Sequence, residues 1–151
     1  MNWKNVATPL LLAALVAAAP IALRAEEAES KNVKEIDAST KSLDIDKLVE
    51  PGHTTIVDIF SQACPPCRAL SPKLDALAKK RKGLKILKLN LGTKQSKEGL
   101  EINWDVPLRA KYDIHSIPYL FLYDEKGVQL AAGEDAYSKV LGWLKKEKLA
   151  K

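Results

Sequence analysis

The chain has 151 residues, enough for one domain with a buried core, and its 46% hydrophobic and 28% charged residues are those of an ordinary globular protein. The formal net charge is +5, carried mainly by lysines spread along the chain, a pattern that excludes a nucleic-acid-binding platform. Two cysteines three positions apart exclude a fold held together by several disulfides.

The first segment has the pattern of a secretory signal peptide. Lys4 precedes an unbroken apolar run over residues 10–19, and Leu23-Arg24-Ala25 forms a small-residue cleavage site. The sequence therefore predicts a signal peptide over residues 1–25, export to a bacterial periplasm or an equivalent compartment, and a flexible polar lead over residues 26–32. The alternative is an uncleaved N-terminal anchor that tethers the same domain outside the cytoplasm.

Residues 33–151 alternate between strand and helix patterns and predict a single domain. The predicted strands are Val33–Ile36, Thr54–Phe60, Leu84–Leu89, Tyr119–Tyr123 and Val128–Ala132. The predicted helices are Asp44–Val49, Cys64–Arg81, Val106–Tyr112 and Tyr137–Leu149. Residues 92–103 form a polar connection to which the pattern assigns no element.

The order of these elements predicts the fold class. Thr54–Phe60 is β-branched and nearly all apolar, which indicates a central strand covered on both faces. Helices between the first strands favour parallel pairing, whereas the turn at residues 124–127 favours an antiparallel hairpin. We therefore expect an α/β domain with three layers, α/β/α, around a mixed central sheet.

The motif Cys64-Pro65-Pro66-Cys67 lies where the central strand ends and a helix begins. A helix N-terminus presents unpaired backbone N–H groups and partial positive charge, which favour a thiolate over a thiol. Cys64, expected to be the more exposed cysteine, is the predicted attacking group. Cys67, one turn further in, is predicted to resolve the mixed disulfide.

A structural disulfide and a metal site are the alternatives for the cysteine pair. A structural disulfide would close so short a loop that it would stabilise the fold only slightly. A zinc site would need further ligands, and the remaining candidates are His53 and His115. We therefore expect redox chemistry and no metal.

Segments on both sides of the motif complete a wider pattern. They are Val57-Asp58-Ile59-Phe60, Pro72 within the helix, Lys88-Leu89-Asn90, Tyr112-Asp113-Ile114-His115-Ser116-Ile117-Pro118, Gly127 and Gly133. In order and approximate spacing, residues 54–133 resemble the thioredoxin superfamily. The resemblance implies the thioredoxin fold, exchange with protein thiol and disulfide substrates, no bound cofactor and a monomer.

The resemblance also implies that Ile117–Pro118 is a cis peptide beside the cysteines. Its backbone would pair with the substrate chain, and with Pro65 and Pro66 these residues would line the substrate site. The alternative is an ordinary trans proline that opens a strand. His115 is expected to be a surface residue, with a place beside the substrate groove as the alternative.

Asp58 and Lys88 each interrupt an apolar strand, where an unpaired charge is costly. The family pattern places such a pair beneath the cysteines. Burial would raise the pKa of Asp58 and make it a candidate base for Cys67, with Lys88 assisting proton transfer. The alternative is a structural pair with no part in catalysis.

Departures from the family pattern indicate whether the protein reduces or oxidises its substrates. Ala63 stands where thioredoxins usually have tryptophan, and Pro65 removes a backbone N–H that would help to stabilise the Cys64 thiolate. In this family the residue before the cis proline helps to tune redox behaviour, and Ile117 at that position resembles the reducing members. These features predict a reductase or interchange protein that needs an electron donor, such as a membrane thiol carrier. A thiol oxidase or isomerase, and a non-catalytic assembly or metal-delivery module, are the alternatives.

Overall fold

The computed structural model describes residues 32–150. The predicted signal peptide, residues 1–25, and most of the predicted lead lie outside the described residues. Within residues 32–150, no helix is long and apolar enough to cross a membrane.

The described part of the chain folds around a five-stranded mixed sheet with the strand order β1-β3-β2-β6-β7. The strands are β1 (Val33–Asp37), β2 (Thr54–Phe60), β3 (Leu84–Asn90), β6 (Tyr119–Tyr123) and β7 (Gln129–Ala132). β1, β3 and β2 run parallel, whereas β6 is antiparallel to β2 and β7 to β6. The five predicted strands are confirmed to within a residue at each end.

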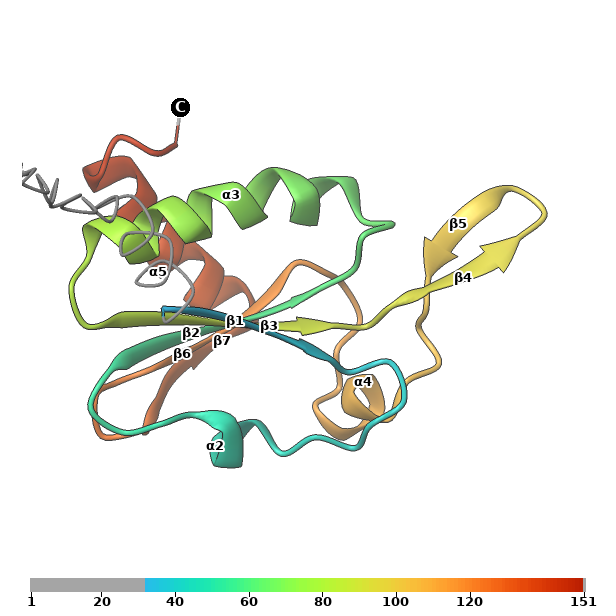
Figure 1. Ribbon diagram of the computed structural model, residues 1–151, viewed down its shortest axis with the longest axis horizontal. Helices are drawn as coiled ribbons and strands as arrows, with labels where there is room; N and C mark the ends of the chain where they lie inside the picture. The colour runs from blue at the N-terminus through green and yellow to red at the C-terminus, as the bar shows by residue number, and fades with distance from the viewer. Residues whose placement is uncertain (1–31, 151) are drawn as a thin grey trace, which may run out of the picture.

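Helices cover both faces of this sheet (Figure 1). α3 (Pro65–Lys80) and α5 (Gly133–Lys146) lie on one face, and α2 (Ile45–Leu48) and α4 (Pro107–Lys111) lie on the other. The predicted three-layer α/β/α arrangement is therefore correct. α5 begins four residues earlier than Tyr137, because Glu134 and Asp135 complement the positive end of the helix dipole.

The central position of β2 follows from its sequence. Every residue from Thr55 to Phe60 is buried. Val57 and Ile59 point into the core on the side of α2 and α4, whereas Ile56 belongs to the core beneath α3 and α5. Successive side chains of a strand alternate between faces, so a strand buried on both sides must be apolar at nearly every position.

Residues 92–103, to which the sequence pattern assigns no element, form a β-hairpin. Its strands β4 (Thr93–Ser96) and β5 (Gly99–Ile102) pair with each other in a separate two-stranded sheet. The hairpin follows β3 and projects as an arm beyond the end of the main sheet, on the side where α3 begins (Figure 1).

Candidate redox-active site

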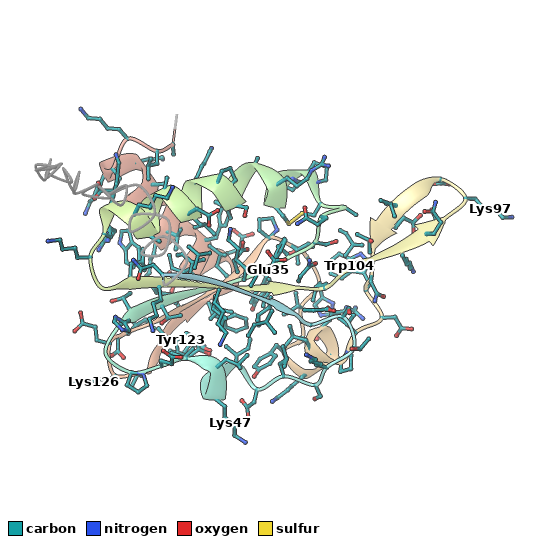
Figure 2. The ribbon with its side chains drawn as sticks, in the orientation of Figure 1. Glu35, Lys47, Lys97, Trp104, Tyr123 and Lys126 are labelled. Atoms are coloured by element: carbon teal, nitrogen blue, oxygen red, sulfur yellow. A yellow bond between two sulfur atoms is a disulfide. The ribbon has the colours of Figure 1, made fainter. Side chains whose placement is uncertain are left out.

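Cys64 and Cys67 form a disulfide at the start of α3, with an S–S distance of 2.06 Å. Figure 2 shows it as a yellow bond at the end of α3 that faces the hairpin. Cys64 is the N-cap residue, and its Sγ accepts a hydrogen bond from the backbone N–H of Cys67 at 3.2 Å. Pro65 and Pro66 have no N–H, so Cys67 supplies the first amide of the helix that faces this sulfur.

The disulfide is almost covered by apolar side chains. Cys64 is 2% exposed and Cys67 0%, so Cys64 is the more accessible cysteine only by a small margin. Phe60 packs against them with Ile117 and Ile102 of the hairpin. Pro65 and Pro66 are exposed beside the disulfide.

The Ile117–Pro118 peptide bond is cis, the form that the resemblance implied. The carbonyl oxygen of Ile117 lies 3.7 Å from Cys64 Sγ. A disulfide sulfur carries no hydrogen, so this is a contact in the oxidised state, and the reduced thiol can donate to the same oxygen. The cis peptide therefore lies directly beside the sulfur predicted to attack.

A groove of about 240 Å³ begins at this peptide. It is lined by Ser116, Ile117, Pro118, Tyr119, Gly133, Glu134 and Tyr137. Glu134 and Tyr137 were not singled out from the sequence, because α5 brings them to the groove from a distant part of the chain. Its lining presents polar and apolar surface in similar amounts, which suits an extended peptide with its own backbone polar groups and side chains.

Asp58 is wholly buried in β2 on the face that α3 covers, since Ile56 two residues earlier points to the core beneath that helix. Neither carboxyl oxygen has a hydrogen-bond partner among the described residues. Burial raises the pKa of Asp58 from 3.8 to about 7, against the opposing effect of the Lys88 charge. The carboxyl group can therefore gain or lose a proton near neutral pH.

Lys88 is the register neighbour of Asp58 on β3, yet it binds elsewhere. Its ammonium group forms an ion pair with Asp75 of α3 at 2.5 Å and donates a hydrogen bond to Ser71 Oγ at 2.7 Å. Asp58 and Lys88 therefore form no direct ion pair. Lys88 influences Asp58 only through its charge. Ser71 and Asp75, spaced four apart on one helix face, are the residues that sequence reasoning missed.

Ser61 connects the loop before Cys64 to the base of the hairpin. Its buried hydroxyl donates to the carbonyl oxygen of Gly92 at 2.7 Å and accepts from the N–H of Ala63 at 3.3 Å. Its carbonyl oxygen accepts from the N–H of Cys64 at 3.1 Å. This residue fixes the redox loop and the hairpin relative to each other.

The histidines lie apart from this arrangement. His115 is exposed and pairs with Asp113 at 2.8 Å, so it is the surface residue that the sequence predicted. Across residues 32–150, no group of three His, Cys, Asp or Glu side chains is placed to hold a metal ion.

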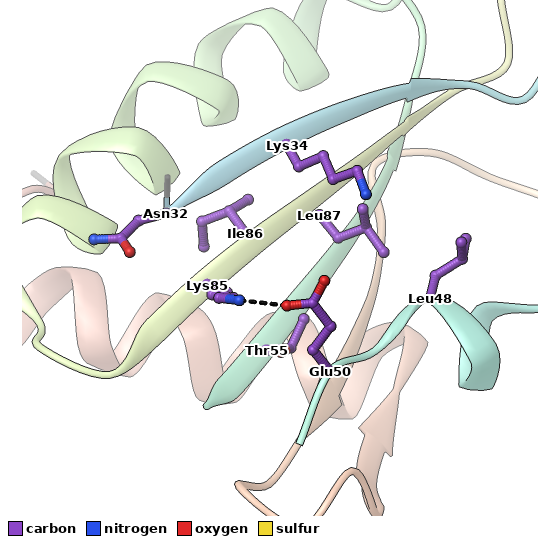
Figure 3. Close-up of a pocket in the computed structure, with 8 residues that line it drawn as sticks. All are labelled: Asn32, Lys34, Leu48, Glu50, Thr55, Lys85, Ile86 and Leu87. Atoms are coloured by element: carbon purple, nitrogen blue, oxygen red, sulfur yellow. Dashed lines mark hydrogen bonds and ion pairs between the residues drawn. The ribbon is translucent and has the colours of Figure 1, made fainter. Parts of the chain in front are cut away.

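A second hollow of about 240 Å³ lies at the opposite end of the strands from the cysteines (Figure 3). Its walls include Leu48, Thr55 and Leu87, and Lys85 closes one side through an ion pair with Glu50 at 2.6 Å. Thr55 and Lys85 stand at the beginning of β2 and β3, whereas Cys64 follows the end of β2. This hollow is therefore separate from the redox site.

Comparison with known proteins gives one consistent result. The family model described as thioredoxin matches residues 35–149. Thioredoxin of Rickettsia felis is 28% identical over 104 residues, 66% of this chain and 87% of the relative. Thioredoxin of Staphylococcus aureus is 32% identical over 108 residues, 71% of this chain and 85% of the relative.

Among solved structures, Trichomonas vaginalis thioredoxin superposes with a TM-score of 0.54 at 21% identity, covering 78% of this chain and 99% of that one. The short form of spinach chloroplast thioredoxin F superposes with a TM-score of 0.50 at 22% identity, covering 78% of this chain and 94% of that one. At these identities the likeness shows the fold.

Proposed function

Since this chain belongs to the thioredoxin family of disulfide oxidoreductases, we propose that it reduces or exchanges disulfides of protein substrates outside the cytoplasm. The observation that carries the proposal is the position of Cys64 Sγ. This sulfur accepts a hydrogen bond from the backbone N–H of Cys67, the first free amide of α3. It also lies beside the Ile117 carbonyl, where the groove begins.

The proposed reaction has two exchange steps. The Cys64 thiolate attacks one sulfur of a substrate disulfide, which forms a mixed disulfide and releases the other substrate sulfur as a thiolate. The Cys67 thiolate then attacks Cys64 Sγ and releases the second substrate thiolate. The substrate gains two electrons, and the Cys64–Cys67 disulfide found here is the product.

Asp58 is proposed to accept the proton of the Cys67 thiol before the second step, through an intervening water. Its pKa of about 7 suits this role because a base works best when its pKa lies near the working pH. Lys88 holds α3 over the site through Asp75 and lowers the proton affinity of Asp58 through its charge. Ile117 and Pro118 are proposed to orient the substrate chain.

The reducing direction is supported by the composition of the motif. Pro65 and Pro66 leave the Cys67 amide as the donor to Cys64 Sγ, and the Ile117 carbonyl points negative charge at the same sulfur. Both features give the thiolate little stabilisation, and strong oxidants depend on a strongly stabilised thiolate. The protein is proposed to act as a monomer. It is also proposed to receive electrons from a membrane thiol donor, because compartments outside the cytoplasm keep thiols oxidised.

The test is the reduction potential of the Cys64–Cys67 pair, measured on the full-length chain by equilibration with glutathione and dithiothreitol mixtures. A value below about −220 mV supports a reductase, whereas a value near −120 mV overturns that direction and indicates an oxidase. If Cys64→Ser retained full function in cells, a non-catalytic assembly role would replace the exchange role. Fractionation and N-terminal sequencing of the mature protein test the proposed export and cleavage after Ala25.

A further inference from the structure

The arm formed by β4 and β5 has two chemically different faces. Side chains alternate along a strand, so Ile102 and Leu100 share a face, as do their cross-strand partners Thr93 and Gln95. We call these four residues the redox-side face of the arm. The other face carries Lys94 opposite Glu101.

The redox-side face begins at the disulfide. Ile102 is partly buried against Cys64, Cys67 and Phe60. Leu100 is the next residue outward on the same face, and 66% of its surface is exposed. An apolar strip therefore runs from the covered disulfide out along the arm. Its outer residue, Leu100, leaves most of its surface open to solvent.

The arm is fixed in place beside the cysteines. Gly92, at its base, accepts hydrogen bonds from Ser61 Oγ at 2.7 Å and from the N–H of Asn103 at 3.3 Å. Trp104, just after β5, is half-buried against the core and lies at the base of the arm (Figure 2). The charged tip around Lys97 points away from the body of the molecule (Figure 2).

The disulfide lies between the arm and the groove. β2, which leads to Cys64, is flanked by β3 on one side and β6 on the other. The arm follows β3, whereas the groove begins at Pro118, just before β6. A protein segment that lay in the groove and extended past Cys64 would therefore reach the redox-side face.

We propose that the redox-side face of the arm binds an uncharged, apolar segment of the protein partner, next to the partner cysteine that reacts with Cys64. This inference rests on the proposed exchange function and adds the chemistry of the partner. Leu100 is the residue that selects for it. The continuity of the strip with the disulfide, and the confinement of Lys94 and Glu101 to the other face, favour an apolar segment over a charged one.

The test compares two peptide disulfides of equal length and charge. Each has one cysteine joined to thionitrobenzoate, flanked by leucine and valine in one peptide and by serine and glutamine in the other. Attack by reduced Cys64 on the peptide sulfur forms the Cys64–peptide disulfide and releases coloured thionitrobenzoate. The readout is the ratio of the two rates for the full-length chain.

The full-length chain is expected to prefer the apolar peptide by about five- to tenfold, the factor for burying the exposed part of one leucine. Leu100→Ser is expected to bring the ratio close to one. Val128→Ser replaces a residue 56% exposed at the turn between β6 and β7, away from the cysteines, and Lys94→Ser changes the charged face; both are expected to keep the preference.

The outcomes separate the two proposals. A wild-type chain that releases thionitrobenzoate from both peptides at equal rates, or a Leu100→Ser chain that keeps the preference, overturns the role of the arm and leaves the exchange function standing. A wild-type chain that releases none from either peptide contradicts the exchange function itself.

Discussion

Lys88 Nζ forms its ion pair with Asp75, on the helix that begins with the redox motif, at a distance of 2.5 Å. Asp58, the register neighbour of Lys88 in the sheet, is left with two carboxyl oxygens that have no hydrogen-bond partner among residues 32–150. Burial therefore has the largest effect on the pKa of Asp58. Lys88, whose charge lowers that pKa, is held by its ion pair with Asp75 on α3.

The Asp75→Asn variant is expected to lower the pKa of Asp58 below about 7. Burial is the main cause of the raised pKa, but the negative charge of Asp75 adds to it and the positive charge of Lys88 opposes it. Asp75→Asn removes the negative charge that raises the pKa of Asp58, and it frees Lys88 to approach Asp58. NMR titration of the Asp58 carboxyl group measures the change. Asp135→Asn, on the exposed part of α5, is the control, and an unchanged titration in Asp75→Asn would refute the assignment.

Asp58 is expected to make the protein less stable as the pH rises. Its folded pKa, about 7, lies above the unfolded value of 3.8, so the bound proton stabilises the fold fully below pH 3.8 and this contribution is lost as pH rises through 7. The free energy of unfolding should fall by about 2 to 3 kcal/mol between pH 5 and pH 8 from this group. Asp58→Asn should lack this loss in urea denaturation at the two pH values. A variant with the wild-type pH dependence would show that another group is responsible.

Cys67→Ser is expected to trap substrate on the protein. Cys64 can still attack, but no second thiol releases the mixed disulfide, so a covalent adduct accumulates. Incubation of the reduced variant with insulin, followed by non-reducing electrophoresis, measures it. Cys64→Ser serves as the matched control and should form far less adduct, since Cys67 lies inside α3, whereas Cys64 Sγ lies at the helix start beside the Ile117 carbonyl. Equal trapping by the two variants would mean that Cys64 is not the attacking residue.

Ser61→Ala is expected to lower the free energy of unfolding by about 1 to 2 kcal/mol, because the partly buried Gly92 carbonyl loses one of its two donors and the Ala63 N–H loses its acceptor. The loss should be accompanied by faster hydrogen exchange at the Ala63 amide. Ser116→Ala, at an exposed position, should change stability by less than about 0.5 kcal/mol. The link between loop and arm would be disproved by an Ala63 amide that exchanges as slowly as in the wild type.

Gly92→Ala and Gly142→Ala are expected to change stability in opposite directions. Gly92 has φ of +76°, and an added Cβ would lie 3.0 Å from Ser39 Cβ, so alanine should cost about 1 to 3 kcal/mol. Gly142 lies within α5 with open space around it, so alanine should add about 0.5 to 1 kcal/mol through helix propensity. Thermal denaturation of both variants checks the two signs, and a stabilised Gly92→Ala chain would contradict this account.

Much of the fold and the centre of the site were predictable from the sequence, because they depend on strong local patterns. A buried strand such as Thr54–Phe60 has an almost continuous apolar sequence, and the motif that follows it marks the helix start. The two cysteines, Ile117 and Pro118 accordingly meet where the sequence and the family resemblance placed them. The roles proposed for these residues remain predictions.

The parts that were missed lack such patterns. Thr93–Ser96 is exposed and polar, so the hairpin strand shows no apolar alternation, and its pairing with Gly99–Ile102 is fixed by the turn and by bonds at its base. The partner of Lys88 was missed for another reason. Asp75 lies on α3 and Lys88 on β3, so the packing of the helix on the sheet decides which carboxylate the lysine reaches.

The two-stranded sheet of the arm also bears on how the protein behaves at high concentration. Within the described residues neither β4 nor β5 pairs with a further strand, so each outer edge presents free backbone groups to which a strand of a neighbouring molecule can add. Charged side chains along a short edge discourage such addition, and the arm carries four of them: Lys94, Lys97, Glu98 and Glu101. These charges lie outside the redox-side face. They therefore protect the arm against self-association and aggregation without adding charge to that face.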